Sequence, residues 1–502
     1  MTLPHSGLPR DEVFARLDVL RRDDLDSRGG RTWAYVYDSG RAEVDEVAGQ
    51  AYLAFLHENG LDPTVFPSVL AMENDVVGIA VTHLGGDEHA VGSFTSGGTE
   101  SCMLAVKAAR DRLRERSGPG RARVVLPDTA HAAFSKAAHY FDLEEVRVGV
   151  DPTTFAADAA ALTAAIDERT ALVVVSAPQY AHGVMDPVEA VAAVTAERDV
   201  WLHVDACIGG WLLPYAARLG VEVPPFDFRV PGVTSISMDL HKYAYCPKGA
   251  SVVLYRDADL RRHQFYACAD WSGYTVINPT MQSTKSAGPL AAAWATLHHV
   301  GDDGYLDVAR RTQAATRRLI DGIAAIDGLE VLGDPRLSLV AAHAPAYDVF
   351  EVVDEMKRRG WYVQPQLAHG ASPANVHFSV TATSEQVVDA MLEDLAAACE
   401  HARGIEVSDE RRTFLAALRG LDPDAFTPEM YAGLLAAAGL GRAASGPNAG
   451  DGAALPPDMA TINAMLDALP AALRERLLIA FLGELFRPAP GGRADAVSPG
   501  AG

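Results

Sequence analysis

The stretch Ser235-Ile-Ser-Met-Asp-Leu-His-Lys242 decides how this chain is interpreted. Residues 233–237 have the composition of a strand, and they deliver His241 and Lys242 into a turn of small and polar residues. A lysine at a strand end, beside a histidine, can be desolvated and made nucleophilic, which Schiff-base chemistry with an aldehyde requires. A His-Lys pair by itself is usually a surface turn, so the interpretation depends on two further segments.

The first of these segments is a glycine turn, Thr95-Ser-Gly-Gly-Thr-Glu100, where an extended stretch passes into a helical one. Gly97 and Gly98 let the backbone approach an anion, and Thr99 offers a hydroxyl and an amide at the start of the predicted helix. An ordinary capped helix start would have a similar composition. The turn therefore indicates an anion site only when other groups of such a site accompany it.

The second segment is Trp201-Leu-His-Val-Asp-Ala-Cys207, whose apolar residues predict a buried strand that ends at Asp205. Ligands of open α/β sheets gather at the carboxyl ends of strands, and a carboxylate there can keep a ring nitrogen protonated. Its alternative role is to cap the strand. An aspartate for a pyridinium nitrogen, a glycine turn for a phosphate and a lysine for an aldehyde are the three groups that bind pyridoxal phosphate (PLP).

Further segments accompany these three along the chain. In order, the segments are Thr95-Ser-Gly-Gly-Thr-Glu-Ser101, Thr129-Ala-His-Ala-Ala-Phe134, Ala177-Pro-Gln-Tyr-Ala-His-Gly-Val-Met-Asp-Pro187, His203-Val-Asp-Ala-Cys-Ile-Gly-Gly210, Pro224-Pro-Phe-Asp-Phe-Arg-Val-Pro-Gly-Val-Thr-Ser-Ile-Ser237 and His241-Lys-Tyr-Ala-Tyr-Cys-Pro-Lys-Gly-Ala-Ser251. Together they resemble the PLP-dependent carbon–carbon lyases of the sphingosine-1-phosphate lyase group, within the group II amino-acid decarboxylases. The resemblance covers residues 30–400 or so.

The resemblance implies fold type I of the PLP-dependent transferases, an α/β fold with a mostly parallel sheet in the large domain. Short apolar runs that alternate with alanine-rich helical stretches between Val76 and Leu297 predict the same arrangement. The expected parts are an N-terminal segment (1–70), a large PLP-binding domain (71–300), a smaller α+β C-terminal domain (301–405) and a helical appendage (406–502).

The resemblance also implies roles at the cofactor. Lys242 binds the cofactor aldehyde covalently, Asp205 pairs with the pyridine nitrogen, and His131 stacks on the ring. The residues implied at the cofactor phosphate are Gly98, Thr99 and His241, and Ser283 is a further residue expected to bind the cofactor. Because family sites are completed by a loop of the neighbouring subunit, for which Ser283–Gly288 is the matching segment here, a homodimer is expected. No metal is expected in the site.

The substrate end of the site departs from the family pattern. The family motif Asn-Pro-Leu-His-Pro is Asn59-Gly-Leu-Asp-Pro63 here, so Asn59 is kept and Asp62 stands at the histidine position. The family's Gly-Ser-Arg-Pro-Gly is Ser283-Thr-Lys-Ser-Ala-Gly288, so Lys285 stands at the arginine position. A carboxylate opposes an anion, and lysine lacks the bidentate fork of arginine. We therefore expect a substrate other than a phosphorylated long-chain base.

Two further residues are expected at the substrate. Lys248 of the family pattern is retained, and Tyr37 matches the family's active-site tyrosine. The expected reaction is retro-aldol cleavage of a 2-amino-3-hydroxy substrate, which releases an aldehyde and requires a proton to return to Cα from Lys242, Tyr37 or His131. Amino-acid decarboxylation is the alternative, since the anion site is altered. An aminotransferase and a non-catalytic PLP-binding scaffold are further alternatives.

The composition agrees with an enzyme of this class. The 502 residues are 49% hydrophobic and 22% charged, which allows a large core. A net charge of −23 lacks the basic footprint of a nucleic-acid-binding protein and opposes an anionic membrane surface. No run reaches the ~20 apolar residues of a membrane helix, and residues 1–30 are too polar for a signal peptide. Five cysteines favour a reducing cytoplasm over a disulfide framework.

Residues 406–502 fall outside the resemblance. Residues 441–457 are rich in glycine, alanine, serine and proline, which predicts a flexible linker, and residues 488–502 are expected to form a disordered tail. Between them, apolar residues from Ile462 to Leu469 recur at helical spacing, and Pro470 separates this helix from a second one. We expect a helical appendage that stabilises the dimer.

Overall fold

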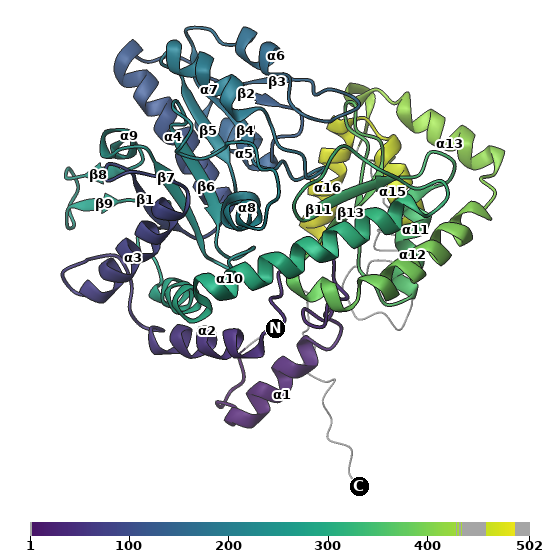
Figure 1. The fold of residues 1–502 in the computed structure, drawn as a ribbon, viewed down its shortest axis with the longest axis horizontal. Helices are drawn as coiled ribbons and strands as arrows, with labels where there is room; N and C mark the ends of the chain where they lie inside the picture. The colour runs from purple at the N-terminus through teal and green to yellow at the C-terminus, as the bar shows by residue number, and fades with distance from the viewer. Residues whose placement is uncertain (1–2, 428, 431–432, 434–457, 487–502) are drawn as a thin grey trace. The chain divides into compact units, whose positions relative to one another are not determined.

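The computed structural model describes residues 3–427, 429–430, 433 and 458–486, so the predicted linker and tail lie outside the described residues. The chain divides into two units, of which Figure 1 shows the elements. The larger unit comprises residues 27–345 and 361–396, and the smaller one draws on residues 1–26, 346–360 and 397–502.

A seven-stranded sheet in the order β1-β7-β6-β5-β4-β2-β3 forms the centre of the larger unit. Its strands are β1 (Val91–Thr95), β2 (Arg123–Pro127), β3 (Glu144–Val148), β4 (Thr170–Ser176), β5 (Trp201–Asp205), β6 (Ser235–Asp239) and β7 (Ser251–Tyr255). Strands β2 to β6 are parallel, and β7 runs antiparallel to both β1 and β6. The predicted α/β fold with a mostly parallel sheet is confirmed.

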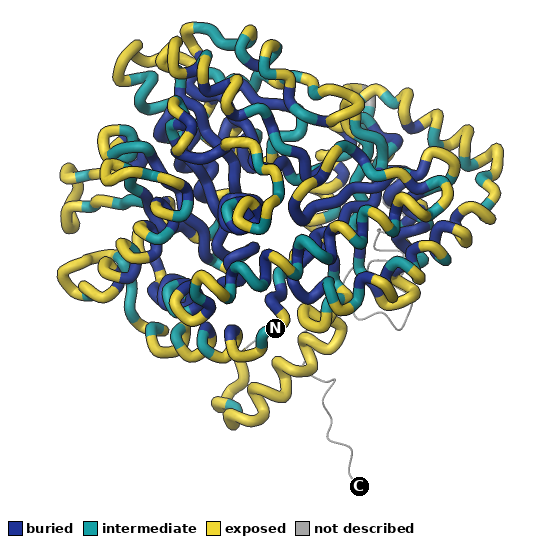
Figure 2. The backbone as a smooth tube through the Cα atoms, viewed as in Figure 1, coloured by how far each residue is buried: buried dark blue, intermediate teal, exposed yellow. Residues whose placement is uncertain are grey.

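Alternate side chains of the central strands enter two cores, one on each face of the sheet. In β4, Leu172 and Val174 belong to one core, whereas Val173 and Val175 belong to the other. Figure 2 shows these strands as the buried centre of the unit. The first core is shared with α4 (Gly98–Ser117) and α5 (Ala132–Phe141), and the second with α3 (Pro67–His83), α7 (Val188–Glu197), α8 (Gly209–Arg218) and α10 (Ala287–Ala324).

The rest of the larger unit includes a four-stranded antiparallel sheet in the order β10-β11-β13-β12. Helix α10 is interrupted where Gly301 has φ 64°. Helix α2 spans Ala42–Ala54. The remaining elements are α6 (Ala159–Ala164), α9 (Ala258–Arg262), β8 (Tyr266–Cys268), β9 (Val276–Asn278), β10 (Glu330–Val331), β11 (Leu339–His343), β12 (Gln364–Gln366), β13 (Asn375–Ser379) and the 3-10 helix η1 (Ala382–Gln386).

The smaller unit contains a separate C-terminal helical region, as predicted. Leu418 packs with Ile462, Met465 and Leu473 in a small apolar core. The carboxylate of Asp354 accepts hydrogen bonds of 2.7 Å from the amides of Met459 and Ala460, which anchors the start of one helix on another. The elements are α1 (Arg10–Leu20), α11 (Val349–Arg358), α13 (Asp409–Arg419), η2 (Pro423–Ala425), α15 (Ala460–Ala468) and α16 (Ala471–Leu485), while α12 (Val388–Arg403) belongs in part to each unit.

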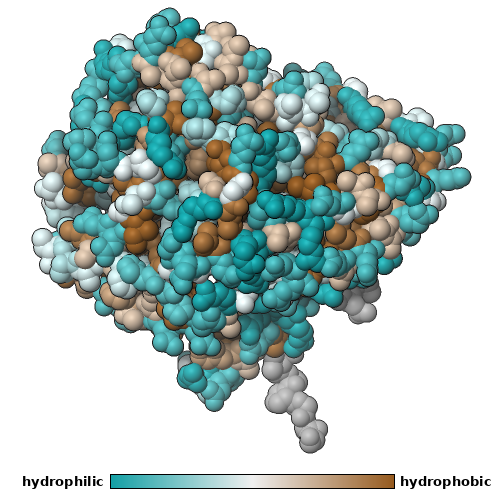
Figure 3. Space-filling view, viewed as in Figure 1, coloured by the Kyte–Doolittle hydropathy of each residue, from teal (hydrophilic) through white to brown (hydrophobic). Residues whose placement is uncertain are grey.

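Hydrophilic residues cover most of the face that Figure 3 presents. Among the described residues, no helix combines the length and the hydropathy needed to cross a membrane.

Candidate active site

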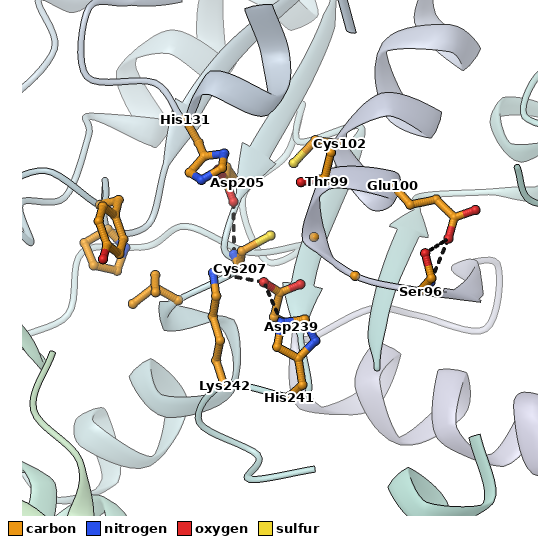
Figure 4. Close-up of a pocket in the computed structure, with 15 residues that line it drawn as sticks. Ser96, Thr99, Glu100, Cys102, His131, Asp205, Cys207, Asp239, His241 and Lys242 are labelled. Carbon is orange, nitrogen blue, oxygen red and sulfur yellow. Dashed lines mark hydrogen bonds and ion pairs between the residues drawn. The ribbon is translucent and has the colours of Figure 1, made fainter. Parts of the chain in front are cut away.

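A cavity of about 360 Å³ lies where the parallel strands of the large sheet end. Its walls come from the loops that follow β1, β2, β4, β5 and β6 (Figure 4). Lys242 and Asp205, which are far apart in the sequence, line this one cavity together with His131 and His241. Ligand sites of open α/β sheets occur at this edge, because the loops there converge while the strands hold them rigidly.

Lys242 lies in the turn after β6, and its Nζ is 2.9 Å from Oδ2 of Asp239, the last residue of that strand. Burial is the largest influence on the pKa of Lys242 and by itself would lower it, but the negative charge of Asp239, together with Tyr37 and Cys207, outweighs burial and places the pKa well above its usual range. The desolvation that the sequence predicted for this amine is present, and the ion pair with Asp239 favours its ammonium form. The nucleophilic role of Lys242 stays a prediction.

Asp205 ends β5 and is 8% exposed. Its Oδ1 accepts hydrogen bonds from the amide of Cys207 at 3.1 Å and from the hydroxyl of Ser237 at 3.4 Å. His131 begins α5 from the loop after β2, and its Nδ1 accepts the amide of Ala133 at 3.1 Å. This contact leaves the proton of a neutral His131 on Nε2.

The glycine turn opens α4 towards the cavity. A side chain at residue 98 has no room, because a Cβ on Gly98 would lie 2.7 Å from the carboxylate oxygens of Asp239. The helix starts without a side-chain cap, so the amides of its first turn are available to a bound anion. Thr99 adds a hydroxyl to the same wall of the cavity.

Glu100 directs its carboxylate away from this anion site and braces the turn (Figure 4). One of its oxygens accepts the amide and the hydroxyl of Ser96, at 2.6 and 2.7 Å. The other accepts the amide of Met281 at 2.8 Å. The glycine turn is therefore tied to the segment that precedes residues 283–288.

The residues around the cavity fit a phosphate-bearing pyridine aldehyde. Nδ1 of His241 and Oδ1 of Asp239 are buried without a hydrogen-bond partner among the described residues. Both atoms are close to the glycine turn, since Gly97 faces His241 and Gly98 faces Asp239. A helix start for a phosphate, Asp205 for a ring nitrogen and Lys242 for an aldehyde therefore meet in one cavity.

Tyr37 and Lys248 lie beside this cavity without lining it. Nζ of Lys248 is 4.8 Å from the centre of the Tyr37 ring, and Tyr37 packs edge-on against Tyr243 at 5.1 Å. Burial raises the pKa of the Tyr37 hydroxyl, and the nearby charge of Lys242 partly offsets this rise. A tyrosine with a raised pKa keeps its proton and can donate it.

The other predicted substrate residues are outside the lining of the cavity, but the fold brings their two segments together. Asn59 pairs with Ser286 in an antiparallel bridge, next to Ser283 and Lys285 in the chain. The ammonium of Lys285 is buried against Glu73 at 2.6 Å. Oδ1 of Asp62 accepts the amide and the hydroxyl of Thr64, at 2.8 and 2.7 Å.

Sequence reasoning missed Asp239, Tyr180 and Cys102 in the lining of the cavity. Asp239 had a signal, because it belongs to the same turn as Lys242. Tyr180 lies in one of the family segments, and its hydroxyl donates to Oε1 of Gln364 at 2.6 Å. Cys102 had no such signal, because its thiol comes close to Cys207 only through the packing of α4 on the sheet.

Comparison with known proteins agrees with this geometry. Residues 43–344 match the family model described as the pyridoxal-dependent decarboxylase conserved domain. Residues 412–484 match a second model, described as "Pyridoxal-dependent enzyme, C-terminal putative HTH domain".

Individual relatives extend the match over most of the chain. The chain is 39% identical to the sphingosine-1-phosphate lyase of Arabidopsis thaliana over 406 residues, which cover 79% of this chain and 73% of the relative. The structure of a Burkholderia pseudomallei sphingosine-1-phosphate lyase is 37% identical, with a TM-score of 0.77, over 85% of this chain and 98% of that one. A glutamate decarboxylase from Lactobacillus brevis, at 20% identity and a TM-score of 0.72 over 81% of this chain and 96% of that one, shares the fold.

The matched segments include every loop that lines the cavity, from the glycine turn to Lys242. The cavity has the chemistry for PLP, and the relatives are lyases that share this part of the chain. The chain therefore belongs to the pyridoxal-dependent decarboxylase family, in its sphingosine-1-phosphate lyase-like branch, and is a PLP-dependent lyase.

Proposed function

We propose that this protein cleaves the Cα–Cβ bond of a phosphorylated 2-amino-3-hydroxy long-chain base and releases an aldehyde. The observation that carries the proposal is the single cavity in which Lys242, Asp205 and the start of α4 converge. The reaction and substrate class are supported by the relatives at 37–39% identity, which are sphingosine-1-phosphate lyases.

This substrate replaces the expectation of an unphosphorylated one. That expectation rested on Asp62 and Lys285 facing the substrate anion, where a carboxylate opposes the anion and a lysine lacks the bidentate fork of arginine. Both groups are already paired, Asp62 with Thr64 and Lys285 with Glu73. Asp62 therefore gives no reason to exclude a phosphate on the substrate. The site that binds this phosphate is predicted to include residues of the neighbouring subunit.

The positions of the groups around the cavity support a role for each of them at the cofactor. PLP, when bound, holds the substrate amine covalently and accepts the electron pair of the bond that breaks at Cα. Asp205 keeps the ring nitrogen protonated, His131 stacks on the ring, and His241 with the glycine turn binds the phosphate. Lys242 would hold the cofactor through its aldehyde, and its amine would be available to the substrate once it is released.

The chain's own residues then move two protons. A base takes the proton of the β-hydroxyl, the Cα–Cβ bond breaks, and the former carbinol carbon leaves as an aldehyde. Cα receives a proton from Lys242, Tyr37 or His131, which yields the amine product. Of these, Lys242 is the cationic donor that faces the cavity, and Tyr37 keeps its proton because burial raises its pKa.

We also propose that the enzyme acts as a cytoplasmic homodimer in which residues 283–288 of one subunit complete the site of the other. The described residues of that segment are held in place by Lys285 and by the contact of Met281 with Glu100. Its exposed residues, such as Ser283, are available to a neighbour.

Amino-acid decarboxylation is the second candidate, because the matching family model is that of decarboxylases. The same cavity would serve it, since only the bond that breaks at Cα differs. The two reactions are distinguished by their products, an aldehyde for the lyase and carbon dioxide for the decarboxylase.

The test combines a spectrum with a product assay. The purified protein is expected to show the absorption band of lysine-bound PLP, and Lys242→Ala is expected to lose the band and at least about a thousandfold in rate. Lys136→Ala, an exposed lysine on α5, is the matched control and should retain both. Aldehyde from a phosphorylated long-chain base, and none from its unphosphorylated form, supports the proposal. Carbon dioxide from an amino acid, without aldehyde from either base, overturns it.

A further inference from the structure

Two thiols and a carboxylate meet on the Asp205 side of the cavity. Among the described residues, Cys102, Asp205 and Cys207 place one ligand atom each within 4.8 Å of one another, and all three are buried. Cys102 comes from α4 and Cys207 from the loop after β5, so the sheet and the helix that packs on it bring them together (Figure 4). All three also line the cavity, which gives them access to solutes.

Ser237 connects the three groups. Its hydroxyl lies 3.3 Å from Sγ of Cys207, 3.7 Å from Sγ of Cys102 and 3.4 Å from Oδ1 of Asp205. The cluster therefore offers two sulfurs, a carboxylate oxygen and a hydroxyl within one small volume. The proposed lyase reaction uses only Asp205 from this set and leaves the two thiols without a role.

We propose that this cluster is a binding site for a thiophilic divalent cation such as Zn²⁺ in the cofactor-free enzyme, and that this cation and PLP exclude each other. Two thiolates favour Zn²⁺ over Mg²⁺ or Ca²⁺, and zinc sites also accept a carboxylate oxygen as a ligand. The proposal uses the cofactor cavity but does not depend on which reaction the enzyme catalyses.

The geometry is close to what such an ion requires. Zinc–sulfur bonds of about 2.3 Å in a tetrahedral site place two sulfurs about 3.8 Å apart. The present separations of up to 4.8 Å need only small side-chain rotations. Binding releases the two thiol protons, so the ligands carry three negative charges and the bound ion leaves a net charge of −1. The ammonium of Lys242 opposes a cation only weakly, because Asp239 neutralises it.

The exclusion follows from the shared carboxylate. Asp205 holds a protonated ring nitrogen through its negative charge. A dication bound to Asp205 engages the carboxylate that the ring nitrogen would otherwise use. The two ligands therefore compete for Asp205 and for the part of the cavity beside it.

The experiment starts from the full-length enzyme after its PLP has been removed with a carbonyl reagent. Cd²⁺ is the probe, because its bonds to thiolates absorb in the ultraviolet. We expect one Cd²⁺ per chain, slower uptake of PLP in its presence, and recovery of uptake when a chelator removes the ion. Cys102→Ser and Cys207→Ser should each weaken Cd²⁺ binding about a hundredfold or more. Cys268→Ser, which changes a thiol outside the cavity, should leave binding unchanged.

Several outcomes would overturn the proposal. Cd²⁺ absorption that survives in both cavity variants, or that disappears in Cys268→Ser, places the ion elsewhere. Unimpeded PLP uptake with Cd²⁺ bound rules out the exclusion. If the mass of the native chain is lower by two hydrogens, and both thiols are lost without a bound metal, Cys102 and Cys207 form a disulfide instead. Circular dichroism, with Cys102→Ala as a second variant, separates a lost site from a lost fold. An inactive enzyme that still binds Cd²⁺ contradicts the proposed reaction alone.

Discussion

At the scale of single residues, Asp239 and Lys242 form the contact that most affects cofactor binding. Nζ of Lys242 lies 2.9 Å from the carboxylate, and both groups are withdrawn from bulk water. A lysine must be unprotonated to react with an aldehyde. The ion pair therefore stabilises the resting state of the cofactor-free enzyme and opposes the first step of PLP binding.

Asp239→Asn tests this effect. The substitution removes the charge that raises the pKa of Lys242, so a larger fraction of the amine is unprotonated at neutral pH. Uptake of PLP by the cofactor-free protein should become about tenfold faster for each unit by which the pKa falls. The growth of the cofactor absorption band after mixing measures the rate. Asp239→Glu keeps the acid and is the control, and equal rates in Asp239→Asn and the native protein would contradict the explanation.

Asp186 is expected to make the free energy of unfolding depend on pH. Burial raises its pKa to about 7, although its carboxylate accepts the amides of Ser176 and Ala157. Between its unfolded pKa of ~3.9 and about 7 the folded state binds the extra proton, so this group's contribution to the free energy of unfolding falls as the pH rises through that window. Above it, the contribution is constant.

The asparagine of Asp186→Asn cannot titrate, so this variant should lack the pH-dependent contribution of Asp186 to the free energy of unfolding. The melting temperature of the native protein minus that of Asp186→Asn is therefore expected to decrease from pH 5 to pH 8. Thermal melts of both proteins in the same buffers measure the difference. Asp142→Asn, an exposed residue at the end of α5, is the control and should track the native protein at each pH. A difference that stays constant across this range would show that Asp186 is ionised throughout.

At the scale of elements, α4 combines two functions at opposite ends. Its first turn faces the cavity with free amides, and Glu100 holds the preceding turn through Ser96 while it also binds Met281. Near its other end, Glu115 pairs with Arg262 and His263 outside the site. Two glutamates of one helix therefore have different roles: Glu100 supports the anion site, and Glu115 forms contacts outside it.

Glu100→Gln should weaken cofactor binding. The charged hydrogen bonds that keep the glycine turn in its anion-binding conformation become neutral ones, at a cost of about 1.5 kcal/mol, which corresponds to a tenfold rise in the dissociation constant of PLP. Equilibrium dialysis or fluorescence titration of the cofactor-free protein measures it. Glu115→Gln is the matched control on the same helix, and a similar loss of affinity in both variants would show that α4 as a whole has been destabilised.

At the scale of the whole molecule, the site is proposed to need two chains. The segments around Asn59 and Lys285 lie together but do not line the cavity of their own chain. The smaller unit has its own apolar core around Ile462 and Leu473, and its role as a dimer-stabilising appendage stays a prediction. A truncation after Val407 that remains dimeric would count against that role.

Complementation tests the shared site. Lys242→Ala and Ser283→Glu, whose carboxylate would oppose a phosphate in the neighbouring site, are each expected to be inactive as homodimers. In a mixture that has exchanged subunits, half of the dimers are mixed and each has one intact site, so about a quarter of the native activity should return. Gel filtration checks that both variants are dimers, and activity that stays at the level of the separate variants would mean that each chain forms its site alone.

The sequence by itself predicted the fold class and the cofactor, and it singled out Lys242, Asp205 and the glycine turn as the groups for that cofactor. These follow from local patterns, because apolar runs predict strands and the groups that bind PLP stand at the ends of such strands. It also predicted the two helices separated by Pro470. These inferences need only neighbouring residues in the chain.

Only the tertiary structure decided which groups are paired. The ammonium form of Lys242 is favoured because β6 places Asp239 beside it, and Lys285 forms an ion pair because α3 supplies Glu73. Cys102 reaches Cys207 because α4 packs on the sheet. The charge of a side chain depends on the burial and the neighbours that folding creates, and residues distant in sequence carry no local signal of that contact.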